Sequence, residues 1–136
     1  MIALYFYAKI FEARPTLPAI RKIDAPARLV TASESTVFYL ALEKDDTLHD
    51  ISHCLAEFVG MRGRLSLPLI LHSFNHLSDH SMPLHQAKKM YEALPEILLG
   101  DGVATVEWTT FGWIYEVLIQ DVGENESKGR LVCPQH

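Results

Sequence analysis

The chain has 136 residues, of which 49% are apolar, so its length predicts one domain whose core is large enough to fold without metals or disulfides. Seventeen acidic residues outnumber twelve lysines and arginines and give a net charge of −5, which argues against a protein that binds nucleic acid regardless of sequence. The first residues lack the basic start of a signal peptide. No stretch approaches the roughly eighteen uninterrupted apolar residues of a membrane span, so we expect a soluble protein without a membrane partner.

Cysteine and histidine are the residue types of this chain most typical of zinc sites. Cys54 and Cys133 lack the CxxC spacing of a zinc ribbon and do not indicate a disulfide framework, so we expect a reduced, cytoplasmic setting. His72, His76 and His80 would share one face if their segment were helical. The apolar run before His72 instead favours a strand followed by a connection, so we expect no metal site and no cofactor.

Apolar periodicity and turn signals place the elements along the chain. We expect five strands, over residues 2–11, 35–43, 66–73, 103–109 and 113–120. We expect two helices, over residues 47–61 and 83–98, each with apolar residues at helical spacing. This order predicts an α/β fold, a two-layer domain in which two helices pack on a mixed β-sheet.

Local signals predict how several elements begin and end. Thr47 offers a cap for the start of the first helix, and Ser81, followed by Pro83, offers one for the second. Pro95 lies within the second helix and should kink it or end it early. Residues 123–136 form a polar tail that we expect to be loosely held. Three prolines after the first strand argue against a long helix or a central strand there: Pro15, Pro18 and Pro26.

Residues 73–78 connect the third expected strand to the second helix, at a place where α/β proteins bind ligands. The positive N-terminal end of the following helix favours negative charge there. His76 lies in this connection and can donate, accept or carry a proton near neutral pH. The alternative is a histidine that only caps a turn.

Two short motifs carry a resemblance to a known family. Residues 73–78 (SFNHLS) match its Pro-Phe-Ala-His-Leu-Ser stretch, and residues 109–113 (TTFGW) match its Pro-Phe-Gly-aromatic turn, with a helix between them. The chain thereby resembles the editing domain of archaeal-type threonyl-tRNA synthetases, which shares the fold of D-aminoacyl-tRNA deacylases. The resemblance implies a freestanding D-aminoacyl-tRNA deacylase-like domain over residues 1–122, followed by the polar C-terminal tail at 123–136.

The same resemblance implies a function. Members of the family are hydrolases that cleave the ester of a mischarged aminoacyl-tRNA, such as seryl-tRNA(Thr), and so protect translation fidelity. Editing is needed because serine and threonine differ by one methyl group, which is worth only about 1–3 kcal/mol in selection. The implied partners are the 3′ end of an aminoacyl-tRNA, a synthetase acting in trans and a second copy of the chain in a homodimer. The alternative is a catalytically degenerate module of the same fold that binds tRNA or an amino-acid adduct.

The resemblance also assigns site residues. His76 matches the family histidine and Tyr115 stands where the family has a lysine, so these two are the catalytic candidates. A phenol, with a pKa of about 10, is a poor replacement for an ammonium group, which motivates the alternative of a binding module. Ser73 and Asn75 replace the proline and alanine of the family motif. The candidates for binding the substrate are Ser73, Phe74, Asn75, Phe111, Gly112 and Trp113.

Overall fold

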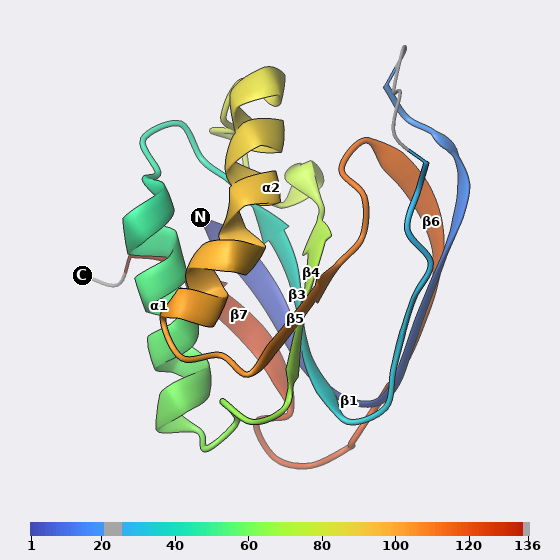
Figure 1. The fold of residues 1–136 in the computed structure, drawn as a ribbon, viewed down its shortest axis with the longest axis vertical. Coiled ribbons are helices and arrows are strands. Elements are labelled where there is room, and N and C mark those ends of the chain that lie inside the picture. Colours follow the sequence, from blue (N-terminus) through green and yellow to red (C-terminus); the bar gives the residue numbers. More distant parts are fainter. Residues whose placement is uncertain (21–25, 135–136) are drawn as a thin grey trace.

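The computed structural model describes residues 1–20 and 26–134 of the chain. Over these residues the chain forms a seven-stranded mixed sheet with two α-helices on one side of it (Figure 1), which confirms the predicted two-layer α/β fold. The strands are β1 (Ile2–Pro18), β2 (Val30–Ala32), β3 (Ser35–Ala41), β4 (Pro68–Ser73), β5 (Thr105–Trp108), β6 (Trp113–Asp121) and β7 (Lys128–Val132). The helices are α1 (Leu48–Met61), α2 (Leu84–Gly100) and the short 3₁₀ helix η1 (Asn75–Leu77). None of the helices described is both long enough and apolar enough to cross a bilayer.

The long strand β1 organises the sheet. Its first half pairs antiparallel with β3 and β7, and its second half pairs antiparallel with β2 and β6. The register with β6 shifts just after Ala8, where the strand changes partners. Strands β3, β4 and β5 run parallel to one another, so their carboxyl ends meet at the same edge of the sheet. Figure 1 shows β1 and β6 curving together away from the two helices.

The core has two parts because β3 and β4 are covered on both faces. The larger cluster lies between the sheet and the helices and includes Phe38 and Leu71. The smaller cluster lies on the opposite face and includes Val37 and Ile70. Side chains of a strand alternate between faces, so these neighbours point to different clusters. Burial on both faces explains the nearly continuous apolar runs from which the strands were predicted.

The helix boundaries confirm one predicted cap and correct the other. The hydroxyl of Thr47 accepts from the backbone N–H of Asp50 at 3.3 Å, as expected for the start of α1. The N-cap of α2 is Pro83, and the expectation that Ser81 caps this helix is wrong. Instead, the hydroxyl of Ser81 points back toward the carbonyl oxygen of Ser78, at 3.3 Å.

Of the two effects predicted for Pro95, a kink or an early end of α2, the early end is wrong. The helix continues to Gly100, and Pro95 is one of its buried residues. A proline removes one helical hydrogen bond, but burial of its ring against the core offsets part of that cost.

Pro15 and Pro18 lie neither in a helix nor in a central part of the sheet, as predicted, but the predicted end of the first strand at residue 11 is wrong. Strand β1 extends through both prolines, which are paired with Tyr115 and Trp113 of β6. Strand β2 pairs only as far as Ala13, so among the described strands only β6 pairs with β1 beyond that point. Proline is tolerated in such an edge position because no ladder hydrogen bond is required of its missing N–H.

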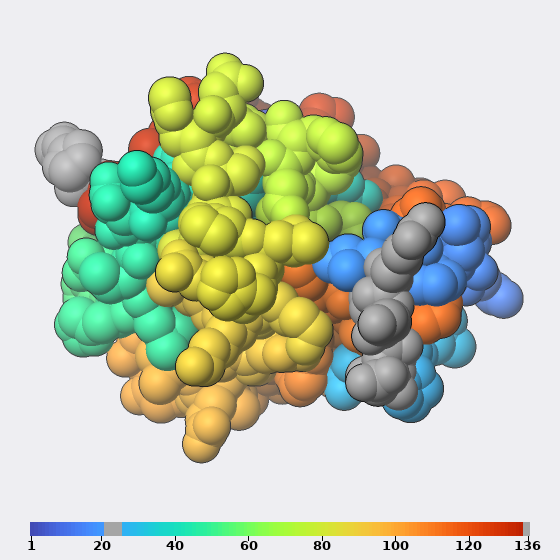
Figure 2. Space-filling model, turned by 90° about the horizontal axis from the view of Figure 1, so that it is seen from above, coloured from blue at the N-terminus to red at the C-terminus, as the bar shows by residue number. Residues whose placement is uncertain are grey.

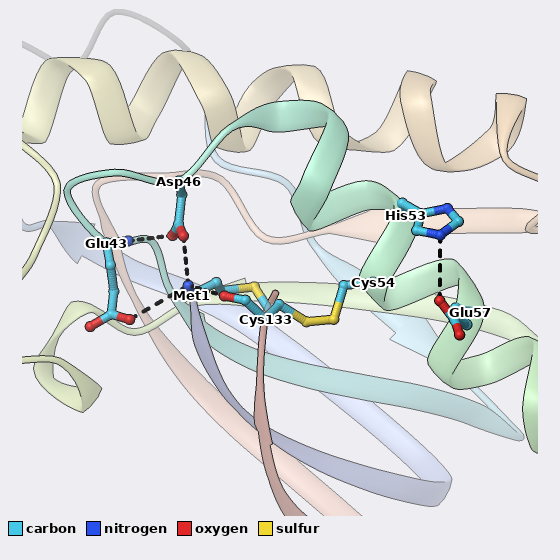
Figure 3. Close-up of a disulfide and its surroundings, with 7 residues drawn as sticks. All are labelled: Met1, Glu43, Asp46, His53, Cys54, Glu57 and Cys133. Atoms are coloured by element: carbon cyan, nitrogen blue, oxygen red, sulfur yellow. Dashed lines mark hydrogen bonds and ion pairs between the residues drawn. A yellow bond between two sulfur atoms is a disulfide. The ribbon is translucent and has the colours of Figure 1, made fainter. Parts of the chain in front are cut away.

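The chain's C-terminal segment is held firmly, contrary to the expectation of a loose tail. Residues 128–132 form β7 on the first half of β1, and Cys133 forms a disulfide with Cys54 of α1 (Figure 3). The amino group of Met1 donates to the carbonyl oxygen of Cys133 at 2.7 Å and pairs with Asp46 at 2.8 Å. The two cysteines meet because β7 returns along β1 to the end of the sheet beside α1. Their pairing removes the argument for a reduced setting.

Candidate active site

A pocket of about 530 Å³ opens at the carboxyl ends of the parallel strands β4 and β5. Figure 2 looks onto this end of the molecule, where the yellow start of α2 and the blue end of β1 flank part of the orange segment that follows β5. The eight residues assigned to the site from the sequence all line this one pocket: Ser73, Phe74, Asn75, His76, Phe111, Gly112, Trp113 and Tyr115. The structure therefore brings together the two motifs, which are more than thirty positions apart in the printed sequence.

The first wall is the turn that leaves β4. The backbone N–H of Phe74 donates to the carbonyl oxygen of Leu40 at 2.8 Å, so the parallel pairing with β3 continues to the edge of the pocket. The chain then enters η1, which places His76 on an exposed turn with its ring edge against Phe74, 5.5 Å between centroids. The hydroxyl of Ser78 donates to the carboxylate of Glu43 at 2.6 Å and fixes the end of this turn.

The second wall is the turn between β5 and β6. Gly112 has a φ of +87°, a left-handed conformation that favours glycine, and its carbonyl oxygen accepts from Ala19 at 2.7 Å. Phe111 is 3% exposed and packs against Tyr91, 5.7 Å between ring centroids. The buried ring of Phe111 and the hydrogen bond between Ala19 and Gly112 hold this turn in place at the pocket.

Tyr115 braces the second wall through its hydroxyl. The phenol accepts from the backbone N–H of Thr110 at 2.8 Å and donates to the carbonyl oxygen of Arg28 at 2.7 Å. The Arg28 guanidinium in turn lies over the ring of Trp108 at 3.9 Å and pairs with Glu107 at 2.8 Å. The hydroxyl of Tyr115 is thus already engaged as both donor and acceptor with the protein's own backbone.

His72 is a partly buried polar residue of the pocket lining. Its Nδ1 lies 2.8 Å from the hydroxyl of Thr109, and its ring contacts those of Tyr39 and Tyr115, at 4.6 and 6.0 Å between centroids. Burial lowers the pKa of His72 to about 4, so the imidazole is neutral at physiological pH. From the sequence, His72 was a candidate only for a metal ligand. A polar residue next to the end of an apolar strand was the signal that could have found it.

The structure separates the three histidines that would share a face if their segment were helical. His72 lies in β4 and His76 in η1, so these two and His80 do not share a helix face. Over residues 1–20 and 26–134 there is no group of three histidine, cysteine, aspartate or glutamate side chains arranged to hold a metal ion.

Comparisons with known proteins agree with this architecture. The family model for the archaea-specific editing domain of threonyl-tRNA synthetase matches residues 1–129. Curated protein sequences include no match to this chain. Among solved structures, the chain is similar to a c-Myc DNA unwinding element binding protein, with a TM-score of 0.73 and 15% identity over 99% of this chain and 100% of that one.

A second similar structure is that of a probable eukaryotic D-amino acid tRNA deacylase. It has a TM-score of 0.68 and 8% identity, and the match covers 96% of this chain and 97% of that one. At such low identities the likeness shows the fold alone, and it confirms the predicted D-aminoacyl-tRNA deacylase-like fold. The family match over nearly the whole sequence goes further: the chain belongs to the archaea-specific family of threonyl-tRNA synthetase editing domains.

Proposed function

We propose that this chain is an editing hydrolase that cleaves the ester between a wrongly attached amino acid and its tRNA, with seryl-tRNA(Thr) as its substrate. The observation that carries the proposal is the single pocket lined by both family motifs. Its volume of about 530 Å³ lies within the range of roughly 300–1,000 Å³ that is usual for small-ligand sites. We further propose that the acceptor end of the tRNA enters this pocket, and that a second copy of the chain and a synthetase in trans are partners.

Backbone amides supply the chemistry that ester hydrolysis needs. Among the described residues, the N–H groups of Asn75 and His76 on one wall, and of Phe111 and Gly112 on the other, have no backbone acceptor. Such donors stabilise the negative charge that develops on the ester oxygen, and they do so without a protein nucleophile. Leu84, in the first turn of α2, also lines the pocket and brings the positive end of that helix close to it.

His76 and Tyr115 take different roles in this proposal. His76 is exposed on the turn beside Phe74, where its imidazole can orient a water molecule toward the ester. Tyr115 is a positioning residue, because its hydroxyl is bonded to Thr110 and Arg28 and holds the second wall in place. The lysine of the family pattern has no counterpart at position 115, so the backbone donors and the substrate's own hydroxyls carry more of the reaction.

A panel of aminoacyl-tRNAs tests the proposal. The purified protein is incubated with seryl-tRNA(Thr), threonyl-tRNA(Thr) and a D-aminoacyl-tRNA, and release of the amino acid is followed over time. We expect release of serine well above the uncatalysed rate, with threonine largely retained. Release from the D-aminoacyl-tRNA alone would contradict the proposed substrate.

One observation favours a second candidate function, a binding module that has lost turnover. Tyr115 occupies the position of the family lysine, and its hydroxyl is already held by two backbone groups. This candidate predicts that a non-hydrolysable seryl-adenosine analogue binds while no member of the panel is cleaved. Cleavage of seryl-tRNA(Thr) excludes it.

A further inference from the structure

The pocket lining includes an imidazole that neither family motif contains. His72 lies on β4, one residue before the first motif begins, and it lines the same pocket as the motif residues. It is fixed on three sides by Tyr39, Tyr115 and Thr109. A side chain held in this way is preorganised to contact a ligand without further ordering.

Among the residues that the structure describes, one nitrogen of the His72 ring has a hydrogen-bond partner. Nδ1 is paired with the Thr109 hydroxyl at 2.8 Å, and Thr109 in turn is tied through its carbonyl oxygen to the buried Tyr91 hydroxyl at 2.7 Å. Within the part of the chain that the structure describes, Nε2 has no hydrogen-bond partner. It is also not fully buried. Nε2 is therefore the polar atom that His72 can offer to a molecule in the pocket.

The protonation of His72 defines which group suits Nε2. The ring is neutral, so Nε2 carries either a hydrogen or a lone pair, depending on which of Nδ1 and the Thr109 hydroxyl donates to the other. An ammonium group can only donate and a carboxylate can only accept. A hydroxyl does both, so it satisfies Nε2 in either tautomer.

We propose that His72 is a specificity-determining residue whose Nε2 binds the side-chain hydroxyl of the aminoacyl group, so that the pocket prefers a seryl group over an alanyl group. This inference rests on the proposed function, since it places the amino acid in this pocket. An alanyl group leaves Nε2 unpaired in a largely desolvated place. Loss of one such partner corresponds to roughly 10- to 100-fold in affinity or in kcat/KM.

Two other polar groups of the pocket, from Thr110 and Asn75, are less suited to this role. The Thr110 hydroxyl already accepts from the backbone N–H of Arg28 at 2.9 Å. Asn75 lies on the first wall, in η1, with the exposed His76 next to it. Asn75→Ala is therefore the comparison variant for this alternative, because it removes another polar pocket group while leaving His72 in place. The matched control is His49→Gln, which removes an imidazole of α1 outside the pocket.

The test measures binding as well as turnover. Non-hydrolysable 3′-amide analogues of seryl-adenosine and alanyl-adenosine are titrated calorimetrically against the wild type, His72→Phe, His72→Gln, Asn75→Ala and the control His49→Gln. We expect the wild type to bind the seryl analogue roughly 10- to 100-fold more tightly than the alanyl analogue. This ratio should fall to near one in His72→Phe, be partly retained in His72→Gln and be unchanged in His49→Gln. Asn75→Ala should not abolish it.

The results distinguish a wrong role for His72 from a wrong proposed function. If the wild type binds both analogues equally, or if His72→Phe keeps the seryl preference, the role of His72 is wrong. If the preference for the seryl analogue is lost in Asn75→Ala but kept in His72→Phe, the side-chain amide of Asn75 binds the hydroxyl and the role of His72 is wrong. If the seryl preference depends on His72 but seryl-tRNA(Thr) is not cleaved, the inference stands and the proposed hydrolase activity fails. Thermal unfolding of each variant shows that it is folded, and the conservative His72→Gln keeps the test open should His72→Phe not fold.

Discussion

The hydroxyl of Tyr115 lies 2.8 Å from the backbone nitrogen of Thr110 and accepts its hydrogen, so a side chain of β6 holds the turn that precedes its own strand. The same hydroxyl donates to the carbonyl oxygen of Arg28, 87 positions away in the sequence. Through these two bonds Tyr115 ties the second wall of the pocket to the segment that leads into β2.

Removing only the Tyr115 hydroxyl tests its two hydrogen bonds separately from the packing of its ring. In Tyr115→Phe the ring still contacts His72, but two hydrogen bonds are lost, so we expect about 1–2 kcal/mol lower stability and a reduced rate of serine release. Urea unfolding and deacylation assays measure the two effects. The matched control is Tyr5→Phe, which removes a hydroxyl bonded to the carbonyl oxygen of Glu126, away from the pocket. Equal activity in the two variants would mean that the brace does not position the site.

The disulfide should stabilise the fold without contributing to the site. Cys54 and Cys133 are 79 positions apart, so the disulfide lowers the conformational entropy of the unfolded chain and thereby stabilises the folded state by about 4 kcal/mol. Neither cysteine lines the pocket. We expect a reducing agent to lower the Tm markedly while the deacylation rate of the folded protein is retained. The double variant Cys54→Ser/Cys133→Ser should have the same low Tm with and without reductant. A Tm of the wild type that does not respond to reduction would contradict this account.

Stability should fall at mildly acidic pH because of His72. Its pKa is about 4 in the folded protein and about 6.5 when unfolded, so between these values the unfolded chain binds more protons. The contribution of His72 to the free energy of unfolding is fully present above pH 6.5 and is lost as the pH falls toward 4. The total loss is about 3 kcal/mol. His72→Gln should remove this part of the acid sensitivity in urea unfolding measured at pH 7 and pH 4.5. His49→Gln, a change on α1 outside the pocket, should not. Parallel pH profiles for wild type and His72→Gln would show that the imidazole is not desolvated.

Local patterns predicted those elements whose signals lie within a few residues. Helix α1 follows from the cap at Thr47 and from buried residues at helical spacing, such as Ile51 and Leu55. The pocket position follows from a rule about parallel strands, and the eight assigned residues meet there. Strand β7 could not be predicted in this way, because Lys128–Val132 is short, largely polar and stabilised by pairing with β1 at the other end of the sequence.

The functional details that were missed all depend on contacts between distant segments. The disulfide requires β7 to return beside α1, which no spacing of cysteines reveals. The brace by Tyr115 requires Arg28 to lie next to the second wall. The neutral state of His72 results from burial among aromatic rings contributed by other strands. Residue types alone indicated a histidine-containing site. The folded chain shows that His72 lines the pocket from β4, partly buried, and that His76 lies at the exposed turn.

The central claim is tested most directly by following serine release from seryl-tRNA(Thr) with wild type, His76→Ala and His49→Ala. The account predicts rapid release by the wild type and by His49→Ala, whose histidine is on α1 outside the pocket. It predicts a loss of about 100-fold or more in His76→Ala, the usual range for a group that assists proton transfer. Full activity in His76→Ala would remove that residue from the mechanism, and absence of release by the wild type would contradict the editing function itself.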